Sequence, residues 1–405
     1  MNKITPLALT LFLIPTCYQT AQGADLITLI PNLYTSDGQE GITLAPPAGP
    51  FPSHAAHFTL SSSSVVNLLN SVIGQEIRSL PISSTPGGLS YRYDSEKGTY
   101  KLGRRNLGPV LAQSGQTLGK GNRTFAFTFT HFEYDEFNGE DISHLSVDTL
   151  HQFDVIDPDD SPQSFENDVV NILFDIDLEV ESYTFYGAYG LTDNLDVSLT
   201  VPIVSVDMDV NALASVVVSP ENPFPNAHQF SEEPNTDNPN DSASGSETGI
   251  GDVVIALKYG YDKGQKMDVA TFLAVKLETG DEDNFLGTGS TTVQPAVFAE
   301  YEISDLWSVH GNLGYEWDTN DNDESTLRSI LGVTVGHSKL TGSLEVANRY
   351  QPDGDDVGDD KTDLGIGLKW NPAQQSIVSA SAVVPLNDDG LRSDLIVGVG
   401  YEIFF

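Results

Sequence analysis

Apolar and polar residues alternate with a period of two along most of the chain after Arg123. In the clearest case, Trp307 to Trp317, the odd-numbered residues are mainly apolar and the even-numbered ones mainly polar. Successive side chains of a β-strand point to opposite faces, so this alternation predicts a strand with one apolar face. A soluble sheet with one wet face would alternate too, but here a tryptophan stands at each end of the apolar face. Transmembrane strands of about ten residues, tilted near 45°, carry aromatic residues at both membrane interfaces. The segment therefore indicates a transmembrane strand.

The same pattern recurs often enough to predict a closed barrel. The predicted strands lie near residues 123–134, 172–190, 194–210, 249–262, 267–280, 291–303, 306–318, 326–336, 339–350, 362–371, 375–386 and 393–405. Short links, such as Thr192-Asp193 and Ser304-Asp305, alternate with longer acidic ones, such as 135–171 and 211–248. This alternation is typical of bacterial outer-membrane barrels, which have an even number of strands, short periplasmic turns and longer external loops. The predicted fold class is all-β: a closed antiparallel transmembrane β-barrel of about 12 strands, with an N-terminal mixed plug-like segment.

The aromatic residues of the strands predict where the barrel meets the two membrane interfaces. Val397, Val399, Tyr401, Ile403 and Phe405 alternate to the end of the chain, which resembles the C-terminal signature by which outer-membrane barrels engage their assembly machinery. The predicted interface aromatics are Trp307, Tyr315, Trp317, Trp370, Tyr401 and Phe405.

The N-terminal part of the chain differs from the barrel. Residues 1–23 read as a signal peptide, with Lys3 before an apolar run and a small-residue cleavage site at 21–23. Cys17, the one cysteine, lies inside it. An alternative role for Cys17 as a lipidated residue is disfavoured by the preceding Pro15-Thr16. If Cys17 is removed with the signal peptide, the mature chain has no thiol, which excludes disulfides and thiolate metal sites. Residues 24–120 form the predicted plug-like or periplasmic segment, with a helix near 65–77 and a short hairpin that pairs Tyr91 and Tyr93 with Tyr100. Residues 121–405 form the barrel.

The charge narrows the possible partners. The chain carries 58 acidic and 19 basic residues, a formal net charge of −39. Such a field repels nucleic acid, which is excluded as a partner. After the N-terminal segment the apolar runs are far shorter than the ~18 residues of a transmembrane helix, so the expected partners are outer-membrane lipid and lipopolysaccharide, met by strands. The acidic loop at 351–360 lacks the ligand order of a known calcium loop, so we predict a solvated loop and no dedicated metal site.

Several blocks are similar to one family. The run 186–197, YGAYGLTDNLDV, continuing to Val201-Pro202, resembles a hairpin of the meta-pathway phenol-degradation outer-membrane proteins. The blocks at 249–253, 257–259, 279–281 and 287–289 are similar to those that follow it in the family, and 312–315 also fits. The resemblance covers residues ~170–405 and implies an outer-membrane transporter for hydrophobic or aromatic compounds. The hairpin motif itself predicts a turn between two strands, so it points to a barrel family more than to a chemistry.

Charged residues fall repeatedly on the face opposite the apolar one, which would line the lumen. The lumen candidates are Asp196, Lys258, Lys276, Glu278, Glu300, Glu302, His310, Glu316, Arg328, Glu345, Arg349, Lys369 and Glu402. They either pair with each other or the N-terminal segment in a filled barrel, or they line a permeation path, where charge sets selectivity. Ser308, His310 and Glu316 are the nearest approach to a hydrolase set, but the motif of outer-membrane phospholipases is absent, so no catalytic residue and no cofactor is predicted.

Three functions remain to be compared. The first is a channel for passive uptake of small, hydrophobic or aromatic solutes across the outer membrane. The second is a structural or adhesive surface protein that acts through acidic, cation-binding loops. The third is a barrel hydrolase. The alternation and the family resemblance favour the channel.

Overall fold

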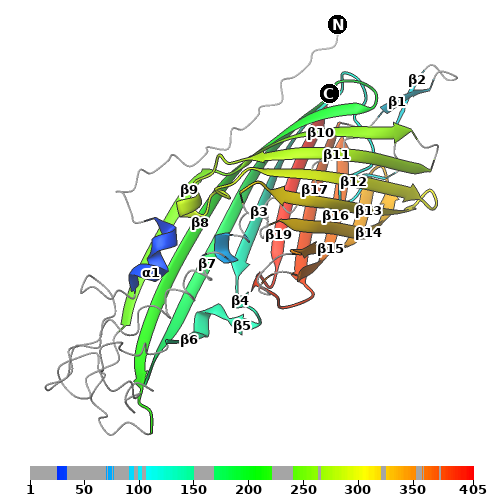
Figure 1. The fold of residues 1–405 in the computed structure, drawn as a ribbon. Helices are drawn as coiled ribbons and strands as arrows, with labels where there is room; N and C mark the ends of the chain where they lie inside the picture. The colour runs from blue at the N-terminus through cyan, green and yellow to red at the C-terminus, as the bar shows by residue number, and fades with distance from the viewer. Residues whose placement is uncertain are drawn as a thin grey trace, which may run out of the picture.

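Within the residues that the computed structural model describes, twelve strands form a closed antiparallel barrel (Figure 1). The described residues are 25–33, 70, 72–74, 76, 91–94, 99–102, 106–149, 168–220, 240–262, 266–320, 325–352, 358, 360–373 and 375–405. In chain order the barrel strands are β3 (Arg123–Tyr134), β7 (Val169–Gly190), β8 (Leu195–Val217), β10 (Val253–Asp262), β11 (Met267–Leu277), β12 (Thr292–Glu302), β13 (Trp307–Asp318), β14 (Thr326–His337), β15 (Leu340–Tyr350), β16 (Asp360–Ala373), β17 (Ser376–Pro385) and β19 (Ile396–Phe404). The pairing of β7 with β8 closes the cylinder, so the predicted all-β, closed antiparallel barrel of about 12 strands is confirmed.

The two ends of the barrel differ in their connections. Short links at 191–194, 303–306 and 338–339 lie at one end. The first and last barrel strands meet there, because the N–H of Arg123 donates to the carbonyl of Phe405 (2.9 Å) and the N–H of Phe405 to that of Arg123 (3.1 Å). Outer-membrane barrels place their short turns on the periplasmic side. We therefore call this end periplasmic and the opposite end external.

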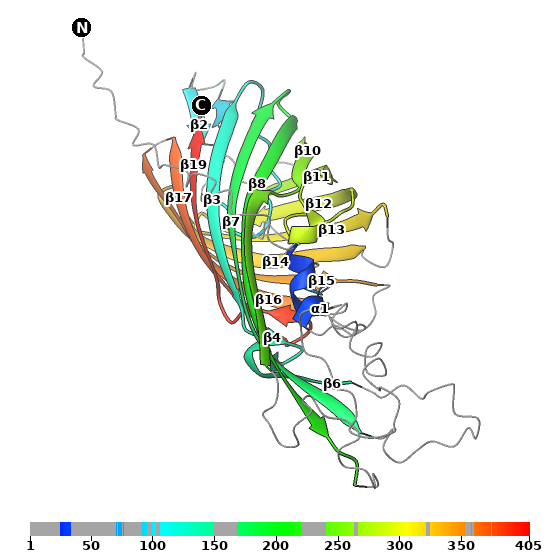
Figure 2. The same ribbon diagram turned by 90° about the vertical axis from the view of Figure 1, so that its left-hand side faces the viewer.

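Strands β7 and β8 are much longer than a membrane crossing requires. They contain 22 and 23 residues, whereas about 9–11 tilted residues span the hydrocarbon core. Their external halves pair with β6 (Leu145–Thr149) and β9 (Asn240–Ile250), and they extend well beyond the barrel wall (Figures 1 and 2). We call residues 145–149, 169–181, 205–217 and 240–250 the external sheet.

The external sheet corrects two predicted loops. Within the links 135–171 and 211–248, the structure forms β6 and β9, and the first link also holds β4 (Glu136–Phe137) and β5 (Glu140–Asp141). An overhanging hairpin would leave the backbone N–H and C=O groups of both its edges unpaired. Strands β6 and β9 supply partners for those groups, which is why these segments are extended.

The strands that enter the external sheet exchange their apolar and polar faces at one height. Strand register aligns His131 of β3 with Glu181 of β7, and Glu181 with Ser205 of β8. On the periplasmic side of this row the outward residues are apolar, such as Phe129 and Tyr183. On its external side the next outward residues are acidic (Glu179, Asp177, Asp207 and Asp209), and the inward ones become apolar and buried. A surface that faces lipid below this row and water above it explains the exchange.

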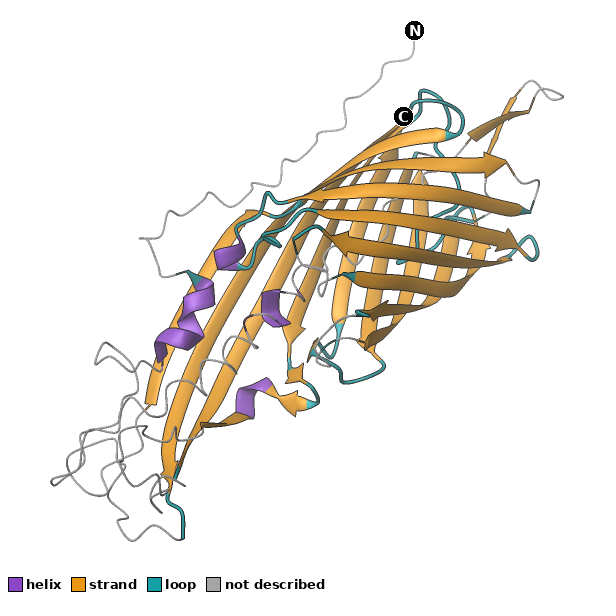
Figure 3. Ribbon diagram, in the orientation of Figure 1, coloured by secondary structure: helices purple, strands orange, loops and turns teal. Residues whose placement is uncertain are grey.

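The inward face of the external sheet carries the main hydrophobic core. Inward side chains of β7 and β8 pack against the helical pieces η1 (Leu26–Thr28) and α1 (Leu29–Leu33) and against Val72 and Ile73. Figure 3 shows the N-terminal helical pieces beside these long strands. The core residues of the two strands are Val170, Ile172, Phe174, Ile176, Leu178, Val180, Val204, Val206, Met208, Val210, Ala212 and Ala214. The Asn70 side chain ties the two N-terminal pieces together, since its Nδ2 donates to the carbonyl of Ile27 at 2.7 Å.

The remaining described elements are short. Strands β1 (Tyr91–Asp94) and β2 (Thr99–Leu102) pair with Tyr93 opposite Tyr100, which confirms the predicted hairpin. The others are η3 (Ile142–His144), η5 (Glu282–Asn284) and β18 (Leu391–Arg392), which pairs with β4. In the described part of the chain, the helices are all too short or too polar to span a bilayer. The predicted signal peptide, with Cys17, and most of the acidic loop at 351–360 lie outside the described residues, and of the helix predicted near 65–77 the described residues are helical.

Candidate functional site

The strand register brings the predicted lumen residues to one inner surface. Glu300 lies opposite His310, and Arg328 lies opposite Arg349. The candidates on this surface are Asp196, Lys258, Lys276, Glu300, Glu302, His310, Glu316, Arg328, Glu345, Arg349, Lys369 and Glu402. The register places these residues on the inner face of the strands. Their role in lining a permeation path is part of the function proposed below.

Glu278 is the exception among the predicted lumen residues. Strand β11 ends at Leu277, and Glu278 is exposed beyond it. Side chains replace the ladder here: the N–H of Val253 donates to the Thr279 hydroxyl (2.9 Å), and the N–H of Thr279 donates to the Asp252 carboxylate (3.1 Å). Glu278 therefore lies outside the paired strand, and its place on the inner face stays a prediction.

The chain between β2 and β3 lies against the inner wall of the barrel. We call residues 106–118 the luminal segment. At its start the N–H of Leu107 donates to the Thr341 hydroxyl of β15 at 2.9 Å, and at its end the N–H of Leu118 donates to the Asp196 carboxylate of β8 at 2.8 Å. Because these strands stand on different sides of the barrel, the luminal segment crosses the lumen.

The centre of the luminal segment is bound by one carboxylate. Oε2 of Glu345 accepts the N–H groups of Val110 (3.0 Å) and Leu111 (2.9 Å), and Oε1 accepts that of Ala112 (2.7 Å). Nε2 of His310 lies 3.1 Å from Oε1, and both side chains are fully buried. Successive backbone N–H groups that converge on an anion form a strong, charge-assisted cradle. Glu345 therefore anchors the segment to the wall.

Two glycines of β16 let the luminal segment approach closely. A Cβ at Gly365 would overlap the side chain of Leu111, and one at Gly367 would overlap Val110. Both glycines are on the inner face, opposite Glu345 and Ser343 of β15. The absence of side chains at these positions is what makes room for the segment.

Ser308 and His310, which the sequence offered as part of a hydrolase set, make hydrogen bonds to the barrel wall and to the luminal segment. Nε2 of His310 faces Glu345, and the Ser308 hydroxyl makes hydrogen bonds with Thr334 and, at 3.2 Å, with Glu300. A nucleophilic serine needs its hydroxyl within hydrogen-bond reach of a base. Here the Ser308 hydroxyl also accepts a hydrogen bond from Asn106 of the luminal segment at 3.0 Å. Ser308 and His310 therefore help to hold the luminal segment against the barrel wall.

An internal cavity of about 250 Å³ lies in the barrel beside the luminal segment. One part of its lining is apolar, with Phe272, Phe298 and Ile330, and the rings of Phe272 and Phe298 are 5.1 Å apart between centroids. Another part is basic, and includes Arg349 and Lys361. We call this cavity the chamber.

The basic residues of the chamber are held in ion pairs. The carboxylate of Glu76, one of the described helical residues 70, 72–74 and 76, pairs with Nη2 of Arg349 (2.5 Å) and with Nζ of Lys361. Burial alone would raise the pKa of Glu76, but the two positive charges outweigh it and lower that pKa to about 2. Glu76 is therefore ionised in the folded protein.

The chamber also contains charged residues that the sequence did not single out. Arg392 donates to the Asp363 carboxylate at 2.7 Å, and Lys361, which is 2% exposed, stands on the same face of β16 as the predicted Lys369. Lys361 and Asp363 are separated from Lys369 by even numbers of residues, so the alternation of the strand could have placed both on the inner face. Only the fold could bring Glu76 to them.

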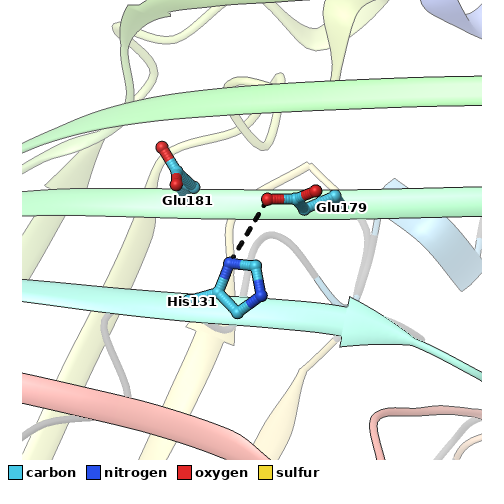
Figure 4. Close-up of side chains that lie close together, drawn as sticks. All are labelled: His131, Glu179 and Glu181. Atoms are coloured by element: carbon cyan, nitrogen blue, oxygen red, sulfur yellow. Dashed lines mark ion pairs between the residues drawn. The ribbon is translucent and has the colours of Figure 1, made fainter.

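A second polar cluster lies on the outer surface at the height where the strands exchange faces. Nδ1 of His131 lies 3.4 Å from Oε1 of Glu179, and the ligand atoms of His131, Glu179 and Glu181 lie within 4.8 Å of one another (Figure 4). Imidazole nitrogen and carboxylate oxygen are common ligands of divalent metal ions. The sequence did not indicate this group, because β3 and β7 are far apart in the chain.

The outer surface of the barrel is apolar around its circumference. The predicted interface aromatics are all exposed, from Tyr315 at 36% to Phe405 at 62%. Exposed outward residues between the two ends are Leu199, Ile255, Leu257, Leu273, Val297, Leu313, Leu331, Leu344, Val346, Ile366, Leu368 and Val399. A continuous exposed apolar band on a closed sheet fits contact with lipid and not with water.

Together, the closed barrel, its apolar band and its polar inner wall define a transmembrane β-barrel of the outer membrane. The model of the family described as "Putative MetA-pathway of phenol degradation" matches residues 157–392. The chain belongs to this family.

Comparison with solved structures finds outer-membrane barrels with low sequence identity. An outer membrane channel from Pseudomonas putida F1 is 12% identical, with a TM-score of 0.44 over 73% of this chain and 100% of that one. A deletion mutant of TodX, a monoaromatic hydrocarbon channel, is 9% identical, with a TM-score of 0.39 over 80% and 100% of the two chains. CymD, also a monoaromatic hydrocarbon channel, is 9% identical, with a TM-score of 0.35 over 71% and 89%. A search of curated proteins finds no match.

Proposed function

We propose that this protein is a channel for passive uptake of small hydrophobic or aromatic compounds across the outer membrane. The observation that carries the proposal is the chamber: a cavity inside a transmembrane barrel, with Phe272 and Phe298 in its lining. Small-molecule sites are concave, mostly apolar, and hold a few placed polar groups. Family membership and the wall contacts of Ser308 favour transport over hydrolysis.

We further propose that residues 24–120 act as a plug. The luminal segment crosses the barrel and is anchored at Glu345, and Glu76 is bound to the wall at the chamber. Each of these contacts occupies space that a solute would need. Transport then requires the luminal segment to move, and the Glu345 cradle is the contact that resists this movement.

Transport can be tested with a pair of variants on one strand. Ala296 of β12 faces the chamber, and Ala299 of the same strand faces outward. We expect Ala296→Trp to lower uptake of radiolabelled phenol into vesicles with a lipopolysaccharide outer leaflet at least severalfold. Ala299→Trp should leave uptake at the wild-type rate, because tryptophan is favourable on this membrane-facing surface. Heat-modified migration on gels should show that both variants form barrels.

The proposal has a clear failure. If no aromatic or small polar solute enters vesicles that contain the wild-type protein or a variant lacking residues 24–120, the channel function is rejected.

The acidic outward face of the external sheet supports a second candidate function, that of an adhesive or structural surface protein. Its outward face carries Asp175, Asp177, Asp207 and Asp209 beside the His131 cluster. Lipopolysaccharide is a partner that this surface would meet through divalent cations. Cation-dependent binding of lipopolysaccharide to the purified protein, lost when these four aspartates become asparagine, would support it. The exposed strand β19 and Phe405 are the expected contact with the barrel-assembly machinery.

A further inference from the structure

The chamber concentrates positive charge in a strongly acidic protein. Arg328, Arg349 and Lys361 stand opposite one another on the neighbouring strands β14, β15 and β16, in a chain with 58 acidic and only 19 basic residues. Like charges directly opposite each other destabilise a sheet. A row of three cations on one inner wall is therefore costly unless anions are bound to it.

The anions that balance this row come from two sources. Arg328 pairs with Glu316 at 2.9 Å, and the nearby Arg392 pairs with Asp363, so both have wall partners. Arg349 and Lys361 instead pair with Glu76, which the N-terminal segment brings to them. The Glu76 carboxylate, which comes from outside the barrel wall, thus pairs with two positive charges of the wall.

The surroundings of Glu76 provide space for an aromatic ring. Phe272, Phe298, Arg349 and Lys361 line the same cavity. Its volume is about 250 Å³, and an apolar cavity of about 150 Å³ is enough to hold benzene. The chamber can therefore hold one ring with a small substituent.

We propose that the chamber binds a small aromatic monocarboxylate, with its ring at the phenylalanines and its carboxylate at Arg349 and Lys361 in place of Glu76. This inference rests on the channel function proposed above and names its substrate class. Exchange of one carboxylate for another keeps both cations paired. A neutral ring that displaced Glu76 would leave two buried charges unpaired, which is strongly unfavourable. Glu76 thus acts as a stand-in for the substrate, and the chamber binds an anionic ring more tightly than a neutral one.

The acidity of the external surface does not prevent this selection. Exposed charges are screened over a Debye length of about 8 Å at physiological ionic strength, whereas buried pairs are screened much less. The external acids are exposed, and Glu76 and Lys361 are buried.

The test compares binding of benzoate and its neutral isostere benzamide by equilibrium dialysis against the purified full-length protein in detergent. We expect benzoate to bind at least tenfold more tightly than benzamide. Arg349→Gln and Lys361→Gln should each weaken benzoate binding about tenfold or more, because each removes a charged hydrogen-bond donor. Glu76→Gln should strengthen benzoate binding about tenfold, since it removes the competing charge. Lys361→Arg should retain most of the affinity.

Lys339→Gln is the matched control, because it removes one positive charge at an exposed periplasmic turn. It should leave benzoate affinity unchanged. Equal binding of benzoate and benzamide, or equal effects of Lys361→Gln and Lys339→Gln, would overturn the inference. Weaker benzoate binding in Glu76→Gln would also overturn it, because Glu76 would then support the ligand instead of competing with it.

Uptake into vesicles separates the failure of this inference from failure of the channel. If benzamide and phenol enter while benzoate does not, the anion preference is wrong and the channel function stands. If none of the three enters, both are rejected. Entry of benzoate that Ala296→Trp abolishes supports both.

Discussion

The two halves of the β7–β8 hairpin share one hydrogen-bonded ladder but have opposite surfaces. In the periplasmic half, the outward residues are apolar and the inward ones polar, as in Tyr183, Leu199 and Val201 against Thr184 and Ser198. In the external half, aspartates point outward and the residues that point inward are buried, such as Phe174 and Met208. Because the backbone is the same in both halves, the solvent on each side accounts for the difference.

The row of His131, Glu181 and Ser205 marks the height at which the surroundings change. Below it the outer surface of the closed barrel meets lipid. A charge facing lipid costs several kcal/mol near the midplane, and the outward residues at this height are accordingly apolar. Above the row the sheet has water outside, and its inner face needs a core of its own, which η1, α1, Val72 and Ile73 supply. The N-terminal segment is thus both the covering of the external core and the source of Glu76.

The largest effect should come from the core of the external half. Phe174, which is 1% exposed, packs in that core. We expect Phe174→Ala to destabilise the external sheet by about 3–5 kcal/mol, through lost burial and the cavity left behind. Hydrogen exchange should rise in the external sheet while the barrel strands stay protected. Thr184→Ala, on the same face of β7 at membrane height, should change exchange very little. Equal effects would mean that the two halves are not distinct.

A charge on the outward face should distinguish the halves in the opposite sense. Leu199 is 47% exposed on the outward face of β8 at membrane height, and Asn211 is on the same face in the external half. We expect Leu199→Arg to cost about 2–4 kcal/mol in lipid, and Asn211→Arg to stay within about 0.5 kcal/mol. Urea unfolding in lipid vesicles would measure both. A harmless Leu199→Arg would contradict contact with lipid at this height.

A smaller effect is expected where η1 and α1 lie on the external sheet. A Cβ at Gly245 of β9 would lie 2.7 Å from Cδ2 of Leu26, so Gly245→Ala forces the helical segment outward. Overpacking of this kind costs about 1 kcal/mol or somewhat more. Protease cleavage near residues 26–33 should accelerate in this variant. Ser244→Ala, which changes the exposed outward face, should be cleaved at the wild-type rate.

The fold could be predicted from the sequence wherever one face of a strand meets lipid. Alternation placed β3, β13 and β15 within a residue or two of their observed bounds. Strand β9 was missed because its sequence, NDSASGSETGI, is mostly polar and shows no apolar alternation, and only the edge of β8 makes it a strand. The sequence also identified the face of most lumen residues, because parity alone determines it.

The ion-pair partners in the lumen could not be predicted. Glu76 and Lys361 are 285 residues apart in the chain, and their contact depends on the path of the N-terminal segment. The Glu345 cradle is formed by backbone N–H groups of the luminal segment, and backbone groups carry no sequence signal. Pairings of this kind require the register between strands, which the pattern of a single strand does not contain.

The smallest effect should come from the acidic outer face of the external half. Asp207 lies opposite Glu179, and its pKa is raised by partial burial and by the negative charges of Asp209 and Asp177. The folded protein therefore holds this proton more tightly than the unfolded chain does, so stability falls as the pH rises through the raised pKa. Asp207→Asn should stabilise the external sheet at pH 7 by no more than about 0.5 kcal/mol.

The stabilisation by Asp207→Asn should disappear in acid, where Asp207 itself is protonated. Asp175→Asn removes the same charge from the outer end of β7, where the residue opposite is the neutral Asn211, so we expect a smaller gain. Hydrogen exchange of the external sheet at several pH values would measure both. An Asp207→Asn variant that is less stable at pH 7 would show that the carboxylate is bound by a cation there, and the outer face would then be a cation-binding surface instead of a repulsive one.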